Sequence, residues 1–132
     1  MTLPPYASAL GAWVERSADV PLVVMLGGDH VLGRPGFVHG GALAGLLEIA
    51  GLVALHAALG EDAPRIKPIT VTVDFRRGAR LIETRAIGHV TRLGSRIANI
   101  DAFAWQEDRT RPVASARMNV LLDRGAASDE QE

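Results

Sequence analysis

The sequence of 132 residues contains no cysteine, so it cannot form disulfide bonds, thiolate metal sites or a cysteine nucleophile. Aromatic residues account for only 5% of the chain, and its charges nearly balance, leaving a net charge of −1. Because the basic excess that attracts a phosphate backbone is missing, we expect no nucleic-acid partner. The four histidines (His30, His39, His56 and His89) lack the close spacing of zinc ligands, and we therefore expect no metal site.

The length and the ends of the chain indicate one small domain. A chain of this size has room for a single hydrophobic core, and 48% of its residues are hydrophobic. The first residues, MTLPPYASALGAW, lack the basic region and the long apolar region of a secretory signal. We expect residues 1–123 to form the domain, residues 124–132 to form a disordered polar tail, and the protein to be cytoplasmic.

The longest apolar run extends from Gly40 to Gly60, and its only polar side chains are Glu48 and His56. About 20 apolar residues are long enough to cross a bilayer. A carboxylate near the middle of the membrane would, however, cost roughly 3 kcal/mol. We therefore expect a helix buried inside the protein, ending at Gly60, and no association with a membrane.

The remaining pattern predicts a short N-terminal helix and several strands. The helix would span Pro5 to Arg16, with Leu10, Trp13 and Val14 on one face, and a first strand would span Pro21 to Leu26. After the long helix, alternation and turn residues predict an antiparallel meander of strands at Ile69–Arg76, Leu81–Thr91, Ile97–Trp105 and Pro112–Leu122. An apolar helix and a sheet with one apolar face must cover each other, which predicts an α+β hotdog fold, with the antiparallel sheet wrapped around the long helix.

The segment that is most informative about function begins the long helix. It contains His39-Gly40-Gly41 and, nine residues after His39, the acid Glu48. This pattern resembles the hotdog acyl-CoA thioesterases of the phenylacetate-degradation (PaaI-like) and 4-hydroxybenzoyl-CoA groups, in their glutamate-type form. The resemblance extends from about Pro21 to Leu122. It implies hydrolysis of an acyl-CoA thioester without a cofactor, by an enzyme that is a dimer or a tetramer.

The chemistry of this segment supports the same reading. The first N–H groups of a helix have no intrahelical partner, and without a Cβ at Gly40 and Gly41 a substrate oxygen could approach them as in an oxyanion site. The resemblance assigns the donor to Gly40. Glu48 would be the catalytic carboxylate, since an acid is costly to bury in an apolar helix without a purpose. A glutamate at a polar dimer seam is the alternative.

The spacing of these two residues predicts a shared site. Gly40 and Glu48 are eight residues apart, which is roughly 12 Å along a helix. One helix cannot bring both residues to one thioester, so we expect a two-fold homodimer whose antiparallel helices complete each other's sites.

Other residues are assigned less central roles. We expect His39 to position the loop through hydrogen bonds, with general base as the alternative. The resemblance places the turn after the predicted strand Leu81–Thr91 near CoA, and its candidate contacts are Arg92, Gly94, Ser95 and Arg96. Arg76 and Arg77 are further candidates, since guanidinium groups suit phosphate oxygens.

Two positions depart from the pattern of the resembling enzymes. Gly33 stands where many of them have an Asn or Gln, and Leu52 stands where glutamate-type members often have a hydroxyl residue. These departures favour an alternative, a non-catalytic hotdog subunit that binds acyl-CoA or an acyl carrier; a hotdog dehydratase is a third possibility. The sequence leaves open the acyl group, the choice between dimer and tetramer, and whether Glu48 is a nucleophile or a general base.

Overall fold

A computed structural model describes residues 2–16 and 20–124. In chain order its helices and strands are α1 (Pro5–Ala9), β1 (Ala12–Glu15), β2 (Leu22–Met25), the short 3-10 helix η1 (Asp29–Val31), α2 (Gly40–Leu59), β3 (Arg65–Phe75), β4 (Thr84–Leu93), β5 (Ile97–Trp105) and β6 (Ala114–Asp123). The predicted long helix and the predicted strand Ile97–Trp105 are confirmed.

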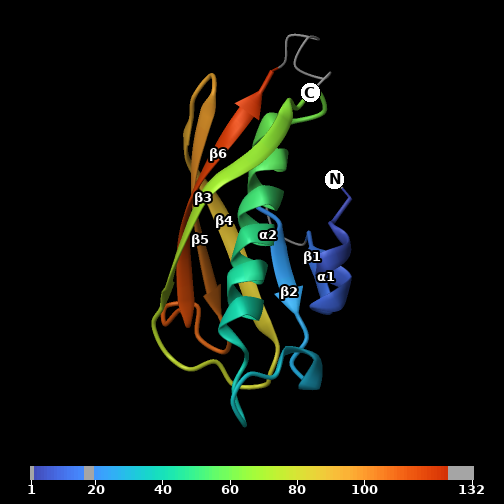
Figure 1. Ribbon diagram of the computed structural model, residues 1–132, viewed down its shortest axis with the longest axis vertical. Helices are drawn as coiled ribbons and strands as arrows, with labels where there is room; N and C mark the ends of the chain where they lie inside the picture. The colour runs from blue at the N-terminus through green and yellow to red at the C-terminus, as the bar shows by residue number, and fades with distance from the viewer. Residues whose placement is uncertain (1, 17–19, 125–132) are drawn as a thin grey trace.

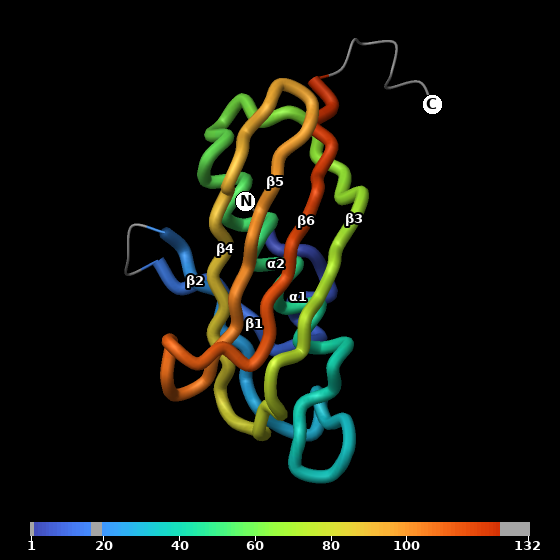
Figure 2. The backbone as a smooth tube through the Cα atoms, turned by 90° about the vertical axis from the view of Figure 1, so that its left-hand side faces the viewer, coloured from blue at the N-terminus to red at the C-terminus, as the bar shows by residue number. Residues whose placement is uncertain are grey.

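The strands form one antiparallel sheet in the order β1-β2-β4-β5-β6-β3. The sheet curves around α2, which lies along its concave face (Figure 1). In the perpendicular view, α2 lies behind β4, β5 and β6 (Figure 2). The predicted hotdog architecture is therefore confirmed.

The core lies between α2 and the sheet. Leu46, Leu47 and Leu55 of α2 are fully buried there. Gly88 of β4 allows the closest approach, because a Cβ at this position would lie 2.8 Å from the Cα of Gly51 and 2.7 Å from the Ala50 carbonyl oxygen. The length and composition of α2 would suffice for a membrane span, but the helix packs as the core helix of the domain, as predicted.

The N-terminal prediction was wrong beyond Ala9. The expected helix to Arg16 ends early because Gly11 has a positive φ of 63°, and residues 12–15 pair with β2 instead. In a strand, neighbouring side chains point to opposite faces, so Trp13 is 40% exposed whereas Val14 packs against the core.

The last four strands differ from a simple meander. β4, β5 and β6 do form consecutive hairpins, but β3 crosses to the far side of the sheet and pairs with β6 rather than with β4. β3 is thus an edge strand, and a register shift between Pro68 and Thr70 interrupts its alternation. Val71 and Val73 pack against the core, whereas Ile69 and Phe75 are each 57% exposed. The buried face that the alternation predicts is therefore confirmed for Val71 and Val73 but not for Ile69 and Phe75.

Most of the predicted tail, residues 125–132, lies outside the described residues. Arg124, the first residue of that prediction, donates a hydrogen bond from Nε to the Ser95 carbonyl oxygen at 3.0 Å. The end of β6 is thereby joined to the turn between β4 and β5.

Candidate active site

His39 caps the N-terminal end of α2. Its backbone is extended, with φ of −61° and ψ of 136°, and its Nδ1 accepts a hydrogen bond from the N–H of Gly41 at 2.8 Å. An Nδ1 that accepts this bond carries no proton, so the neutral ring has its proton on Nε2. The ring is fixed to the first turn of the helix, which supports the positioning role over that of a general base acting through Nδ1.

Gly40 presents the first N–H group of the helix. Within the described residues this N–H has no hydrogen-bond partner, and the helix dipole adds positive potential at this end. A Cβ at Gly40 would lie 3.3 Å from the Phe75 ring, so a larger residue would press on that ring. The absence of a side chain therefore keeps the N–H open to a ligand.

Three backbone contacts fix the loop before Gly40. The N–H of His39 donates to the Val31 carbonyl oxygen at 2.7 Å, and the N–H of Val38 donates to the Ala79 carbonyl oxygen at 2.8 Å. Gly33 packs directly on His39, since a Cβ at Gly33 would lie 2.8 Å from the His39 Cα. A side chain at position 33 would displace the capping residue, and this explains why this chain has none there.

A cavity of about 480 Å³ opens beside the N-terminal end of α2. It is lined by Gly33, Arg34, Phe37, Val38, His39, Gly40, Leu43, Phe75, Arg76, Arg77, Gly78 and Ala79. The lining includes three arginines and no acid. Arg34 lies over the Phe37 ring at 4.3 Å, and Arg76 donates from Nε to the Ser115 hydroxyl at 3.1 Å. Together with the helix end, these cations make the cavity attractive to an anion.

Glu48 lies two turns further along α2, outside the lining of this cavity. It belongs to the stripe of the helix that the sheet leaves uncovered and is half-buried. Within the described part of the chain its carboxylate makes no hydrogen bond or ion pair. One chain therefore brings His39, Gly40 and Gly41 together but does not add Glu48 to them.

The turn between β4 and β5 lies at the opposite end of the molecule from Gly40, beside the C-terminal end of α2 (Figures 1 and 2). Gly94, Ser95 and Arg96 form this turn, and Arg92 lies just before it, near the end of β4. The N–H of Gly94 donates to the Ile97 carbonyl oxygen at 2.9 Å. Of the basic residues considered from the sequence, Arg76 and Arg77 share a cavity with Gly40, and the turn residues do not.

The other histidines occupy separate places. His30 bonds through Nε2 to the Leu10 carbonyl oxygen at 3.0 Å, and His89 lies near the Phe103 ring on the outer face of the sheet. Burial lowers the pKa of His56 below its ordinary value. In residues 2–16 and 20–124, no three His, Asp or Glu side chains are grouped as metal ligands would be.

Sequence reasoning missed several neighbours of these residues. Phe37 and Phe75 form walls of the cavity. The Tyr6 ring lies against Gly45, one turn before Glu48, because a Cβ at Gly45 would be only 2.5 Å from it. The contacts of Phe75 and Tyr6 leave no local signal, since each joins elements that are distant in the sequence, whereas Phe37 lies only three residues before Gly40.

Comparison with known proteins adds the family. The sequence matches the thioesterase superfamily over residues 35–113, a range that includes His39, Gly40 and Glu48. No curated protein matches the chain.

Several solved structures are similar over most of their length. A protein from the thioesterase superfamily is 28% identical with a TM-score of 0.79, and the match covers 90% of this chain and 89% of that one. A phenylacetic acid degradation-related protein from Ralstonia eutropha JMP134 is 22% identical with a TM-score of 0.78, covering 92% of both chains. A thioesterase from Haemophilus influenzae is 18% identical with a TM-score of 0.76, covering 88% of this chain and 80% of that one.

Proposed function

Because this chain belongs to the thioesterase superfamily, we propose that it hydrolyses an acyl-CoA thioester to a free acid and CoA at a site shared between two copies of the chain. The observation that carries this proposal is the open N–H of Gly40 at a cationic cavity. The carbonyl oxygen of the thioester accepts from this N–H, and the negative charge that develops on the oxygen is stabilised by the helix end.

Glu48 supplies the carboxylate of the reaction. Among residues 2–16 and 20–124 it has no partner, and it lies on the uncovered stripe of α2, so it is available to a ligand or to a second chain. It either takes a proton from the water that attacks the thioester carbon or attacks that carbon itself. In the first route the C–S bond breaks after water has added, and the proton taken by Glu48 passes to the sulfur, which leaves as the thiol of CoA. In the second route the C–S bond breaks as an acyl anhydride forms on Glu48, and water then cleaves this anhydride, which releases the acid, restores the carboxylate and supplies the proton for the thiol.

The second copy follows from the distance along the helix. Gly40 and Glu48 are separated by roughly 12 Å of helix, which is too far for both to act on one carbonyl group. A two-fold axis would place the Glu48 of one protomer toward the Gly40 of its partner, twice in each dimer. The exposed edge strand β3, with Ile69 at its surface, offers backbone groups for pairing with another copy.

A non-catalytic subunit that binds acyl-CoA or an acyl carrier is the second candidate. It is favoured by the crowding of Gly33 against His39, which leaves no room for an amide side chain, and by apolar Leu52 one turn after the acid. Such a protein would keep the cavity and the anion attraction but would lack groups that hold water.

A panel of acyl-CoA thioesters with a thiol-trapping reagent separates the two candidates. We expect thiol release from at least one substrate by the wild-type protein and its loss in Glu48→Gln, which keeps the shape of the side chain but cannot accept a proton. Glu61→Gln, an exposed change just beyond α2, is the matched control and should retain full activity. Binding of acyl-CoA without thiol release from any substrate would instead establish the non-catalytic subunit.

A further inference from the structure

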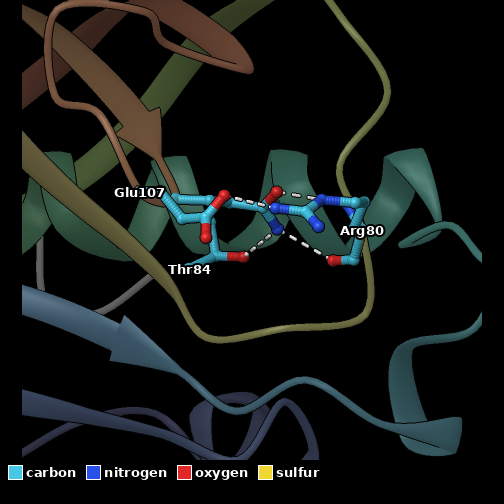
Figure 3. Close-up of polar contacts among 4 residues, drawn as sticks. Arg80, Thr84 and Glu107 are labelled. Atoms are coloured by element: carbon cyan, nitrogen blue, oxygen red, sulfur yellow. Dashed lines mark hydrogen bonds and ion pairs between the residues drawn. The ribbon is translucent and has the colours of Figure 1, made fainter.

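A polar cluster of Arg80, Thr84, Gln106 and Glu107 joins the loop that precedes β4 to the end of β5 (Figure 3). The side chain of Gln106 bonds to both backbone groups of Arg80: its Oε1 accepts from the Arg80 N–H at 3.1 Å, and its Nε2 donates to the Arg80 carbonyl oxygen at 2.8 Å. Nε2 also donates to the Thr84 hydroxyl at 3.1 Å. One carboxamide thus bonds to the backbone of a residue that lies 26 positions away in the sequence.

The chemistry of the cluster fixes the orientation of this amide. The Thr84 hydroxyl donates to the Ile82 carbonyl oxygen at 3.3 Å, so it must accept from its other neighbour, which is Nε2. If the amide were turned over, its oxygen would face the Arg80 carbonyl oxygen and its NH₂ group would face the Arg80 N–H. Because Thr84 is fully buried, water cannot replace the hydrogen bond that the Thr84 hydroxyl would lose.

The loop that contains Ala79 and Arg80 also bonds to the segment that precedes Gly40, the proposed oxyanion donor. Next to Arg80, the Ala79 carbonyl oxygen accepts the N–H of Val38, and Phe37 forms an isolated antiparallel bridge with Arg80. Val38 is followed directly by the capping His39 and by Gly40. A continuous set of bonds therefore runs from Gln106 through residues 79–80 and 37–38 to the N–H of Gly40.

Gln106 and Thr84 are the only residues whose side chains bond to the backbone of residues 78–82 in the part of the chain that the structure describes. The neighbouring ion pair between Arg80 and Glu107 cannot replace them, because its side chains are 59% and 74% exposed and water screens their charges. The amide bonds to the backbone of the loop, whereas the ion pair joins two exposed side chains.

We infer that Gln106 is a positioning residue for catalysis: it holds the 79–80 loop so that the Gly40 N–H points at the thioester oxygen. The inference rests on the proposed function, since it assigns the Gly40 N–H to the reacting carbonyl group. Gln106 does not touch substrate, and its effect passes through the backbone. A shift of about 1 Å in a group that stabilises charge can cost up to about 100-fold in rate.

The test replaces Gln106 by Met, which keeps the length and volume of the side chain and removes all three hydrogen bonds. We expect kcat on the best acyl-CoA substrate to fall about 10- to 100-fold, while KM changes less than about twofold. Glu107→Gln, at the next residue, removes only the exposed ion pair and should match the wild type. Loss of folded protein would also lower the apparent kcat at an unchanged KM, so kcat is calculated per folded molecule, with the folded fraction taken from the urea unfolding curve of each variant.

A second measurement follows the loop without relying on activity. Hydrogen exchange of the Val38 amide should accelerate about tenfold or more in Gln106→Met, while amides of β5 and β6 keep their wild-type rates. If Gln106→Met folds poorly, Gln106→Glu keeps the shape while placing a carboxylate oxygen against the Arg80 carbonyl oxygen, and the same changes are expected.

The outcomes separate this inference from the proposed function. An active wild type with unchanged kcat in Gln106→Met would overturn the positioning role and leave the thioesterase standing. A wild type that hydrolyses no acyl-CoA would overturn the proposed function, and with it the catalytic role of Gln106. In that case the exchange rate of Val38 still decides whether Gln106 holds the loop.

Discussion

The ring of Phe75, at the end of β3, lies over Gly40, the first residue of α2: a Cβ on Gly40 would come within 3.3 Å of the ring. This contact joins the edge strand of the sheet to the helix end that we propose as the oxyanion site. A residue with a Cβ at position 40 would require the ring to move by a few tenths of an ångström. The two residues can therefore be tested as a pair.

Gly40→Ala should lower kcat about 10- to 100-fold, because the methyl group presses on the Phe75 ring and shifts the N–H that would stabilise the oxyanion. Steady-state kinetics on the best acyl-CoA substrate would measure the loss. The double variant Gly40→Ala/Phe75→Leu should recover part of the activity, since the smaller side chain makes room, whereas Phe75→Leu alone should change kcat little. Equal losses in the single and double variants would show that the ring is not the obstacle.

Mixing two weakly active variants tests the shared site. Glu48→Gln chains and Gly40→Ala chains, combined in equal amounts under conditions of subunit exchange, should regain about a quarter of wild-type activity. Half of the dimers would then be mixed, and each mixed dimer would contain one site with both residues intact. Activity measured before and after exchange gives the result. A mixture that is no more active than the average of its parts would place Gly40 and Glu48 in the same chain's site.

The parts of the fold that could be predicted are those whose signals are local. α2 is a run of apolar residues between the His39 cap and Gly60, and β5 alternates within itself. The N-terminal segment was predicted wrongly because Leu10, Trp13 and Val14 have helical spacing. The pairing of residues 12–15 with β2 decides the structure there, and that pairing is a tertiary effect which spacing does not encode.

The candidate site likewise contains residues that local sequence predicts and residues that only tertiary contacts bring to it. His39, Gly40 and Gly41 were found because the start of a helix is chemically distinctive over a few residues. Phe75 contacts Gly40 only because β3 crosses to the far edge of the sheet. Gln106 contacts Arg80 only because the segment after β5 lies beside the loop before β4. Phe75 was predicted only as one of the alternating residues of a strand, and Gln106 stands in no motif, so no pattern in the sequence pointed to these two contacts.

The lowered pKa of His56 predicts how stability depends on pH. Burial disfavours the charged ring, so the unfolded chain binds a proton at a pH where the folded chain does not. This contribution is fully present above the unfolded pKa of about 6.5 and is lost as the pH falls toward the folded value. The free energy of unfolding of the wild type should therefore fall more steeply below about pH 6.5 than that of His56→Gln. Urea titrations between pH 5 and pH 8 provide the comparison, with the exposed His89→Gln as control; parallel curves for wild type and His56→Gln would contradict the assignment.

The two sets of arginines considered for CoA can be separated by kinetics. Arg77 lines the cavity that contains Gly40, whereas Arg92 lies near the end of β4, beside the turn to β5 at the opposite end of the same chain. We expect Arg77→Gln to raise KM for acyl-CoA about fivefold, the equivalent of about 1 kcal/mol for a solvent-screened charge pair, with little change in kcat. The same change should weaken the rise of KM with added salt, because one charge contact is gone. Arg92→Gln is the matched variant and should alter KM by less than about twofold. A larger rise of KM in Arg92→Gln than in Arg77→Gln would mean that CoA lies along the turn between β4 and β5. Because this turn is remote from Gly40 in one chain, the turn that contacts CoA would then belong to the partner.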